Sequence, residues 1–220
     1  ESLAVIPGDG YDEVWAIVKR TINGATVRYV EMLEKLFTDT AAEFTANKGL
    51  NAFFVDSGIT YNGAATVTIT GLDHLEGETV ALLADGSEVA NKVVDWGLVT
   101  LDTAASVVHS GLPYTGILQT MRMDTNLQDG TAQGREKKIH DITLRVCRSG
   151  SFKAGRNESN LDGCFDRERT LTLGAPYPLF TGDIRLGFDG AWEKDGRMMI
   201  VQDRPMPLTL VAVMPEVSVK

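Results

Sequence analysis

The sequence has little of what would cross-link a chain or hold it in a membrane. It contains 2 cysteines in 220 residues, Cys147 and Cys164, fewer than a small secreted domain with a disulfide framework usually has. We therefore expect two reduced thiols in a protein assembled in a cytoplasm; a Cys147–Cys164 disulfide is the alternative. No apolar run approaches the roughly 18 residues of a membrane-spanning helix. We expect no membrane insertion by this segment.

Positive charge is also scarce. The chain has 21 Lys and Arg against 30 Asp and Glu, which gives a net charge of −9 and a pI of about 4.8. A surface of this sign repels phosphate, which excludes a protein that grips nucleic acid through released counterions. DNA fits only as a cargo that slides past the surface without sticking.

The clearest local signal that is present is the pair Asn23-Gly24, which prefers the two-residue type I′ turn of a β-hairpin. The turn sets the expected cross-strand pairs Ile22–Ala25, Lys19–Arg28, Val18–Tyr29, Ile17–Val30 and Trp15–Met32. Both faces are apolar near the base, so we expect a ribbon covered on both sides, with Trp15 largely buried. Lys19 and Arg28 place like charges opposite each other, and they become our candidates for contacts with carboxylates of a neighbouring subunit.

The remaining pattern predicts a mainly β fold, because 22 glycines and many β-branched runs favour short strands and tight turns. Six short strands fall close together between 65 and 113, which predicts a small six-stranded β-barrel. Longer strands on either side predict one larger antiparallel β domain. The expected domains are therefore a discontinuous platform, 1–64 with 114–220, and a barrel inserted at 65–113.

Other elements are expected outside the barrel. The stretch 38–48 is the one segment with helical character, a short helix that Gly49 would end. Phe53 to Val55 predicts a brief buried strand that ends at 56–58. The last hundred residues predict strands at 117–123, 138–148, 171–173, 198–202 and 208–214. The Gly-, Asp- and Asn-rich stretch 154–163 predicts an exposed loop.

Candidate chemical groups are few and isolated. None of His74, His109 and His140 has metal-ligand spacing to a second His or Cys, so we interpret them as surface or turn histidines. Arginines lie near Cys147 and Cys164 in the sequence, and nearby cations can lower the pKa of a thiol. No base and orienting group accompany either cysteine, so buried or idle thiols are the better interpretation.

One loop imitates the start of a calcium site. Glu158, Asn160, Asp162 and Gly163 follow the alternating pattern, but Arg169 stands where the closing acid should fall. A solvated turn is the better interpretation. We therefore expect a structural protein and no enzyme, with no catalytic residues, no cofactor and no metal.

Several blocks together resemble the tail tube and nozzle proteins of bacteriophages. They are DEVWAIVKRTING at 12–24, RYVE at 28–31, FFVDSG at 53–58, YNG at 61–63, GAP at 174–176, LFTGD at 179–183, PMPLT at 205–209 and VMPEV at 213–217. The blocks GLDHLEG at 71–77 and ADG at 84–86 resemble the small FCCH-type barrel module of ubiquitin-activating enzymes. In phage proteins that name describes a shape and carries no chemistry. The resemblance covers nearly the whole chain and implies a larger N-terminal portion before it.

The resemblance implies a structural virion component of a phage or prophage tail. Such a subunit would form a ring with itself, a homohexamer, as part of the DNA ejection conduit. It would contact neighbouring tail or adaptor proteins and would be assembled in the cytoplasm of the bacterial host. The alternative is a receptor- or glycan-binding module of a tail or fibre, which exposed aromatic clusters would favour. Among aromatics, the predicted barrel contains only Trp96, with Tyr61 and Tyr114 at its borders.

Overall fold

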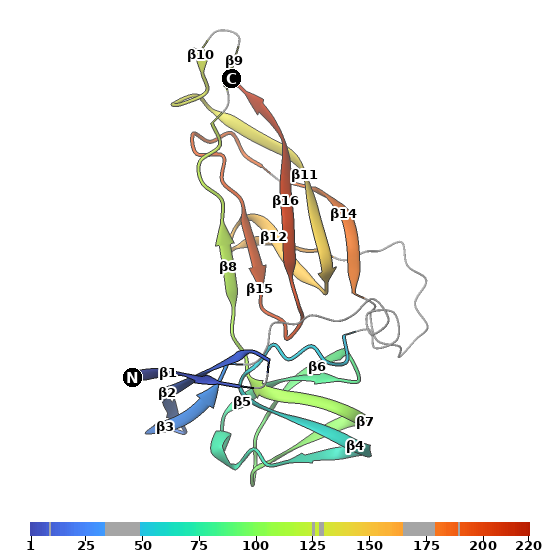
Figure 1. The fold of residues 1–220 in the computed structure, drawn as a ribbon. Coiled ribbons are helices and arrows are strands. Elements are labelled where there is room, and N and C mark those ends of the chain that lie inside the picture. Colours follow the sequence, from blue (N-terminus) through green and yellow to red (C-terminus); the bar gives the residue numbers. More distant parts are fainter. Residues whose placement is uncertain (9, 34–48, 125, 128–129, 165–178, 189) are drawn as a thin grey trace. The chain divides into compact units, whose positions relative to one another are not determined.

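The computed structural model covers residues 1–220 and describes all of them except 9, 34–48, 125, 128–129, 165–178 and 189. The described chain is mainly β and antiparallel, as predicted (Figure 1). Its one helical element is the 3-10 turn η1 (Asp73–Leu75). The helix expected at 38–48 and the strand expected at 171–173 lie outside the described residues. Among the described residues, no helix has the length and apolarity needed to cross a membrane.

The chain divides into two compact units, Glu1–Tyr114 and Thr115–Lys220. The predicted division, with 1–64 joined to 114–220 around an inserted 65–113, is therefore wrong. Strand β4 (Asp56–Thr70) runs straight through the expected boundary at 64, and it forms a long ladder with β7 (Leu98–Leu112). A strand cannot be divided between two domains when one ladder holds both of its halves.

Unit 1 begins with a three-stranded antiparallel sheet, which we call the ribbon. It has the order β1-β2-β3, formed by β1 (Ser2–Pro7), β2 (Asp12–Ile22) and β3 (Ala25–Met32). Asn23 and Gly24 both have positive φ, 46° and 75°, as a type I′ turn requires. Every predicted cross-strand pair of this hairpin is confirmed, from Ile22–Ala25 to Trp15–Met32.

The second sheet of unit 1 has the order β4-β7-β5-β6, with β5 (Thr79–Ala84) and β6 (Ser87–Val93). The Asp85-Gly86 turn between β5 and β6 is present, but the six-stranded barrel is not. Segments expected as separate short strands are single long strands, β4 and β7, which bend at several breaks in register. No ladder joins β6 to β4, so the sheet of the described residues stays open. Phe53 to Val55 is not a strand, and Asp56 to Gly58, where the brief strand was expected to end, begins β4 instead.

The core of unit 1 lies on the β4–β7 sheet and reaches the ribbon. Its buried side chains come mainly from the β4–β7 sheet and the η1 turn: Ile69, Leu72, Leu75, Val80, Leu82, Val94, Val99 and Val108. From the ribbon, Ile22 joins this core and Val27 and Tyr29 pack against it. The hydroxyl of Tyr29 also donates to the carbonyl of His74 at 2.6 Å. The tip of the hairpin is thus fixed to the second sheet by apolar and polar contacts.

Unit 2 consists of two larger sheets around one core, and a two-stranded ladder of β9 and β10. One sheet has the order β14-β11-β16 and the other β13-β12-β15-β8. The strand bounds are β8 (Gly116–Gln119), β9 (Asn126–Leu127), β10 (Gly130–Thr131), β11 (Lys137–Ser149), β12 (Phe152–Asn157), β13 (Asn160–Cys164), β14 (Phe180–Gly187), β15 (Met199–Gln202) and β16 (Thr209–Val219). Side chains of both sheets, among them Ile142, Leu144, Phe152 and Ile200, fill the core.

The stretch 154–163, expected as an exposed loop, is a β-hairpin. Strands β12 and β13 pair there from Phe152–Cys164 to Asn157–Asn160. The strands lie so close that a Cβ at Gly155 would stand 1.8 Å from the carbonyl oxygen of Asn160. The glycine that made the sequence resemble a loop is therefore what permits the hairpin.

Candidate interaction surface

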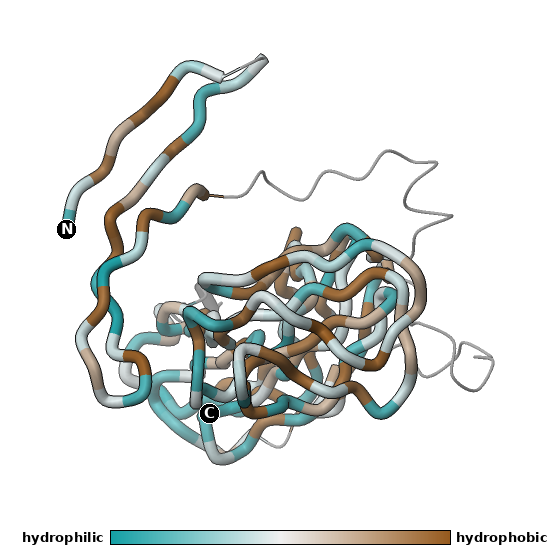
Figure 2. The backbone as a smooth tube through the Cα atoms, turned by 90° about the horizontal axis from the view of Figure 1, so that it is seen from below, coloured by the Kyte–Doolittle hydropathy of each residue, from teal (hydrophilic) through white to brown (hydrophobic). Residues whose placement is uncertain are grey.

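The ribbon has two faces, because side chains alternate along each strand. Near the hairpin turn, the face that carries Ile22, Val27 and Tyr29 packs on the core of unit 1, whereas Leu3 and Val5 on the same face are exposed. The opposite face, which we call the outer face, carries Ile6, Glu13, Trp15, Ile17, Lys19, Arg28, Val30 and Met32 by the observed register. Figure 2 shows the hydrophobic stretches along this ribbon, which starts at the end marked N.

The outer face is apolar and uncovered. Val30 is 69% exposed, Ile6 48%, Met32 42% and Ile17 39%. Trp15, predicted to be largely buried, is only partly buried, and its indole Nε1 donates to Glu13 at 3.0 Å. The prediction that both faces of the ribbon are covered is therefore wrong for the single chain. Exposed apolar side chains gathered on one sheet are typical of an interaction surface.

Lys19 and Arg28 lie opposite each other, as predicted, at the end of the outer face near the hairpin turn. Arg28 forms an ion pair with Glu1 of the same chain, with Nε 2.6 Å from Oε2. Arg28 therefore has a carboxylate partner within its own chain, and its contact with a neighbouring subunit stays a prediction. Lys19 is exposed and forms no ion pair with any residue that the structure describes.

Arg20, on the core-facing side of β2, was not singled out by the sequence. Its guanidinium binds both carboxylate oxygens of Glu31, at 2.9 and 2.7 Å, and reaches Asp56 at 3.1 Å. The hydrogen bond from Arg20 holds the pKa of Glu31 below its ordinary value, and a bond with Ser57 acts in the same direction. Arg20 therefore links the ribbon to the start of β4. Glu31 and Asp56 are far from it in sequence, so no local spacing could reveal the group.

The three histidines are held by ordinary hydrogen bonds. His74 bonds the carbonyl of Ser57 at 2.8 Å, and His140 bonds the hydroxyl of Ser218 at 2.8 Å. His109 is buried, with one ring nitrogen 2.8 Å from the Thr60 hydroxyl and the other 2.7 Å from a backbone carbonyl. The expectation of a surface or turn residue is wrong for His109, which is a core histidine with both nitrogens satisfied.

Both cysteines are free thiols, as expected, and they differ in burial. Cys147 is partly buried, whereas Cys164 is buried in the core of unit 2. Burial raises the pKa of Cys164 to about 12. A thiol with this pKa is protonated at neutral pH and is a poor nucleophile.

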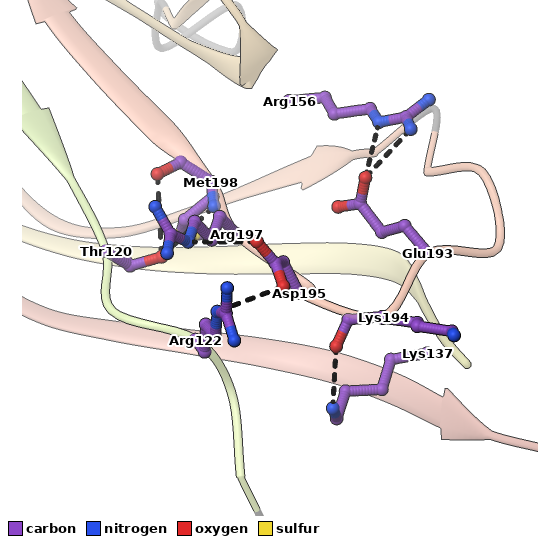
Figure 3. Close-up of polar contacts among 9 residues, drawn as sticks. All are labelled: Thr120, Arg122, Lys137, Arg156, Glu193, Lys194, Asp195, Arg197 and Met198. Carbon is purple, nitrogen blue, oxygen red and sulfur yellow. Dashed lines mark hydrogen bonds and ion pairs between the residues drawn. The ribbon is translucent and has the colours of Figure 1, made fainter. Parts of the chain in front are cut away.

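Unit 2 contains a dense polar network around the segment between β14 and β15 (Figure 3). Arg156 binds Glu193 through two nitrogens, at 3.1 and 2.8 Å. Arg122 lies 3.0 Å from one oxygen of Asp195, and Arg197 lies 3.6 Å from the other. Each acid therefore has an arginine as its ion-pair partner.

The buried Lys137 belongs to the same network. It is 3% exposed, and its ammonium donates to the carbonyl of Lys194 at 2.9 Å. Its backbone exchanges two hydrogen bonds with Glu193, at 2.7 and 2.9 Å. These contacts attach the segment between β14 and β15 to β11. The charged groups of the network bind one another, so the network stabilises the fold of unit 2.

A cavity of about 260 Å³ lies in unit 2 beside the β12–β13 hairpin. Its polar lining residues are Arg156, Ser159, Asn160 and Asp162, and apolar residues such as Phe188 complete it. Asp162 is the one carboxylate of this lining, so the described cavity lacks the carboxylate pair that glycoside hydrolysis uses. Among the described residues, no three His, Cys, Asp or Glu side chains are grouped to hold a metal ion.

No protein-family model and no curated protein sequence matches the chain.

Proposed function

We propose that the chain is a structural subunit of a phage-type tail assembly, in which identical copies form a ring around the path of the DNA. The observation that carries this proposal is the uncovered outer face of the ribbon, with an unpaired lysine at its end. Exposed apolar side chains that gather on one sheet face are typical of a surface that a partner protein covers. The kind of assembly, a phage-type tail, is proposed from the sequence blocks that resemble tail tube and nozzle proteins.

The distribution of charge supports the same role. Unit 1 contains 16 Asp and Glu against 6 Lys and Arg, a net charge of −10. Unit 2 contains 14 against 15, a net charge of +1. A ring that lines a DNA passage gains from repelling phosphate, because each Lys or Arg contact to the backbone adds affinity and therefore friction. In the proposed ring, unit 1 faces the passage, and neighbouring tail or adaptor proteins contact the ring from outside it.

A glycan-binding module is the second candidate, and exposed tryptophans are what favour it. Trp96 is 86% and Trp192 42% exposed. They belong to different units, and Lys220 already lies over the Trp192 ring at 5.6 Å from its centroid. Sugar recognition by stacking works best with rings that converge on one site. The structural role is therefore the better supported of the two.

Electron microscopy of the full-length protein tests the proposal. We expect rings whose symmetry can be counted, and we expect the protein in purified virions by mass spectrometry. The double substitution Lys19→Glu and Arg28→Glu should abolish the rings while the variant keeps the circular dichroism spectrum of the parent. Lys194→Glu, at an exposed lysine of unit 2, is the matched control and should leave rings intact. Monomeric particles from the unmodified protein, or rings that survive the double substitution, would contradict the proposal.

A further inference from the structure

A second exposed apolar site stands on unit 1, at the turn between β6 and β7. We call the segment Val93–Leu98 the Trp96 turn. Trp96 is 86% exposed and Val93 is 58% exposed, the first being the most exposed aromatic side chain on unit 1 among the described residues. Asp95 is exposed and forms no ion pair with any described residue. Tryptophan is among the residue types most enriched in interaction hot spots, and an unpaired acid beside it can select a partner of opposite charge.

The Trp96 turn is rigidly held. Trp96 has φ 54°, a conformation that is rare for a bulky residue. The carboxylate of Glu76 accepts the backbone N–H of Trp96 at 3.1 Å and that of Gly97 at 2.7 Å. A Cβ at Gly97 would lie 2.4 Å from an oxygen of Asp73. Glu76 thus holds the strained backbone of the turn, and the ring of Trp96 stays 86% exposed.

The Trp96 turn and the outer face are complementary. On the outer face, Lys19 is a cation without an ion-pair partner among the described residues, whereas Arg28 is paired with Glu1. In the Trp96 turn, Asp95 is an exposed acid without an ion-pair partner among the described residues. Each surface also exposes apolar side chains. One surface therefore offers an unpaired cation beside apolar side chains, and the other offers an unpaired anion beside Trp96.

We infer that the Trp96 turn of one copy docks on the outer face of the ribbon of a second copy. Trp96 packs against Ile17 and Val30, and Asp95 faces Lys19. Both surfaces are exposed within one chain, so Trp96 does not cover the ribbon of its own copy. Two different surfaces in contact make a heterologous interface, which repeats head to tail and closes into a ring when the rotation allows. The inference deepens the proposed function and rests on it only for the closure of the ring.

Sedimentation of the 220-residue chain across a range of concentrations tests the contact. We expect reversible association that weakens as salt is raised, because an exposed ion pair contributes to it. Trp96→Gly removes the ring and also relieves the positive φ, so the variant folds; its dissociation constant should rise at least about tenfold. Lys194→Glu is the control and should associate like the parent. A chain that is monomeric at every concentration, or a Trp96→Gly variant that associates normally, would overturn the inference.

A charge exchange gives the decisive result. Lys19→Glu alone and Asp95→Lys alone should each weaken association, and their combination should restore it to within about threefold of the parent. Only groups that meet across the interface can rescue each other in this way. Failure of the rescue in folded variants overturns the contact, as does a monomer that binds glycans through Trp96. Mass spectrometry of virions tests the proposed function separately. A chain that self-associates but is absent from virions would contradict the proposed function and would leave the inferred contact supported.

Discussion

At the scale of single residues, the two neighbouring cations of β2 have different roles. Arg20 is directed to the core-facing side, where Glu31 and Asp56 receive its guanidinium. Lys19, the next residue back, stands on the outer face with no partner among the described residues. Alternation along a strand is enough to separate an internal link from a surface charge. The sequence shows two adjacent cations, and it cannot show that a carboxylate more than ten residues away selects one of them.

Arg20→Met should destabilise unit 1 by about 1–3 kcal/mol, because it removes charge-assisted bonds from a mostly shielded pair. Glu31 is 20% exposed in its side chain. Urea unfolding at neutral pH measures the change. Lys92→Met is the control, since its partner Asp102 is 76% exposed and exposed pairs contribute little. Equal losses in the two variants would contradict the assigned link.

The Arg20–Glu31 pair also predicts a dependence on pH. The folded pKa of Glu31 lies below its ordinary value. Its stabilising contribution is therefore complete above that ordinary value and is lost as pH falls through the folded pKa. Below about pH 4.5 the parent should lose stability more steeply than Arg20→Met. Parallel acid curves for the two proteins, by urea unfolding from pH 7 to acid, would contradict this assignment.

Cys164 should resist thiol reagents in the folded protein. Its burial and raised pKa both keep the thiolate population small. We expect a native chain at pH 8 to titrate with one fast thiol, Cys147, and the urea-unfolded chain to titrate with two. Rapid labelling of both in the native state would show that the core of unit 2 opens. Cys147→Ser, which should leave no fast thiol, identifies the residue.

At the scale of elements, the hairpin was predictable and the barrel was not. Asn23-Gly24 is a strong local signal, and a two-residue turn leaves one register for both strands. No comparable sequence signal indicates whether two neighbouring β-rich segments form two strands or one long strand. Leu98–Leu112 is a single strand that bends at irregular pairing, so its halves resemble two strands in the sequence. The candidate cations Lys19 and Arg28 could be predicted because they depend only on that register.

The ribbon predicts opposite effects of one substitution on folding and on association. In the parent, Lys19 and Arg28 are like charges opposite each other. Lys19→Glu replaces this pair with an acid opposite Arg28. Such cross-strand pairs stabilise by roughly 0.2–1 kcal/mol, so the monomer should melt at the same or a higher temperature. The same variant should lose self-association. A fall in melting temperature that parallels the loss of association would mean that the substitution acts through folding.

At the scale of the whole molecule, the domain division depends on contacts that a sequence pattern does not contain. The resemblance on both sides of 65–113 favoured a discontinuous domain. In the structure, the ribbon shares a core with β4–β7 through Ile22, Val27 and Tyr29. Burial of those three side chains is a property of tertiary packing. The apolar pattern is equally compatible with packing on the C-terminal half, so the sequence could not decide between the two.

This division makes a direct prediction about two fragments. Residues 1–114 and 115–220, expressed separately, should each fold, because each unit has its own core. Their spectra should add up to that of the intact chain, and each should unfold cooperatively in urea. A cut at 64 is the control: it severs the β4–β7 ladder, so fragment 65–220 should lose the cooperative unfolding of unit 1. If the discontinuous domain were correct, the cut at 114 would leave the platform incomplete in both products, and only the inserted barrel at 65–113 would fold. The charges of the folded fragments differ by eleven, −10 against +1, so on an anion exchanger at neutral pH residues 1–114 should be retained strongly and residues 115–220 should not.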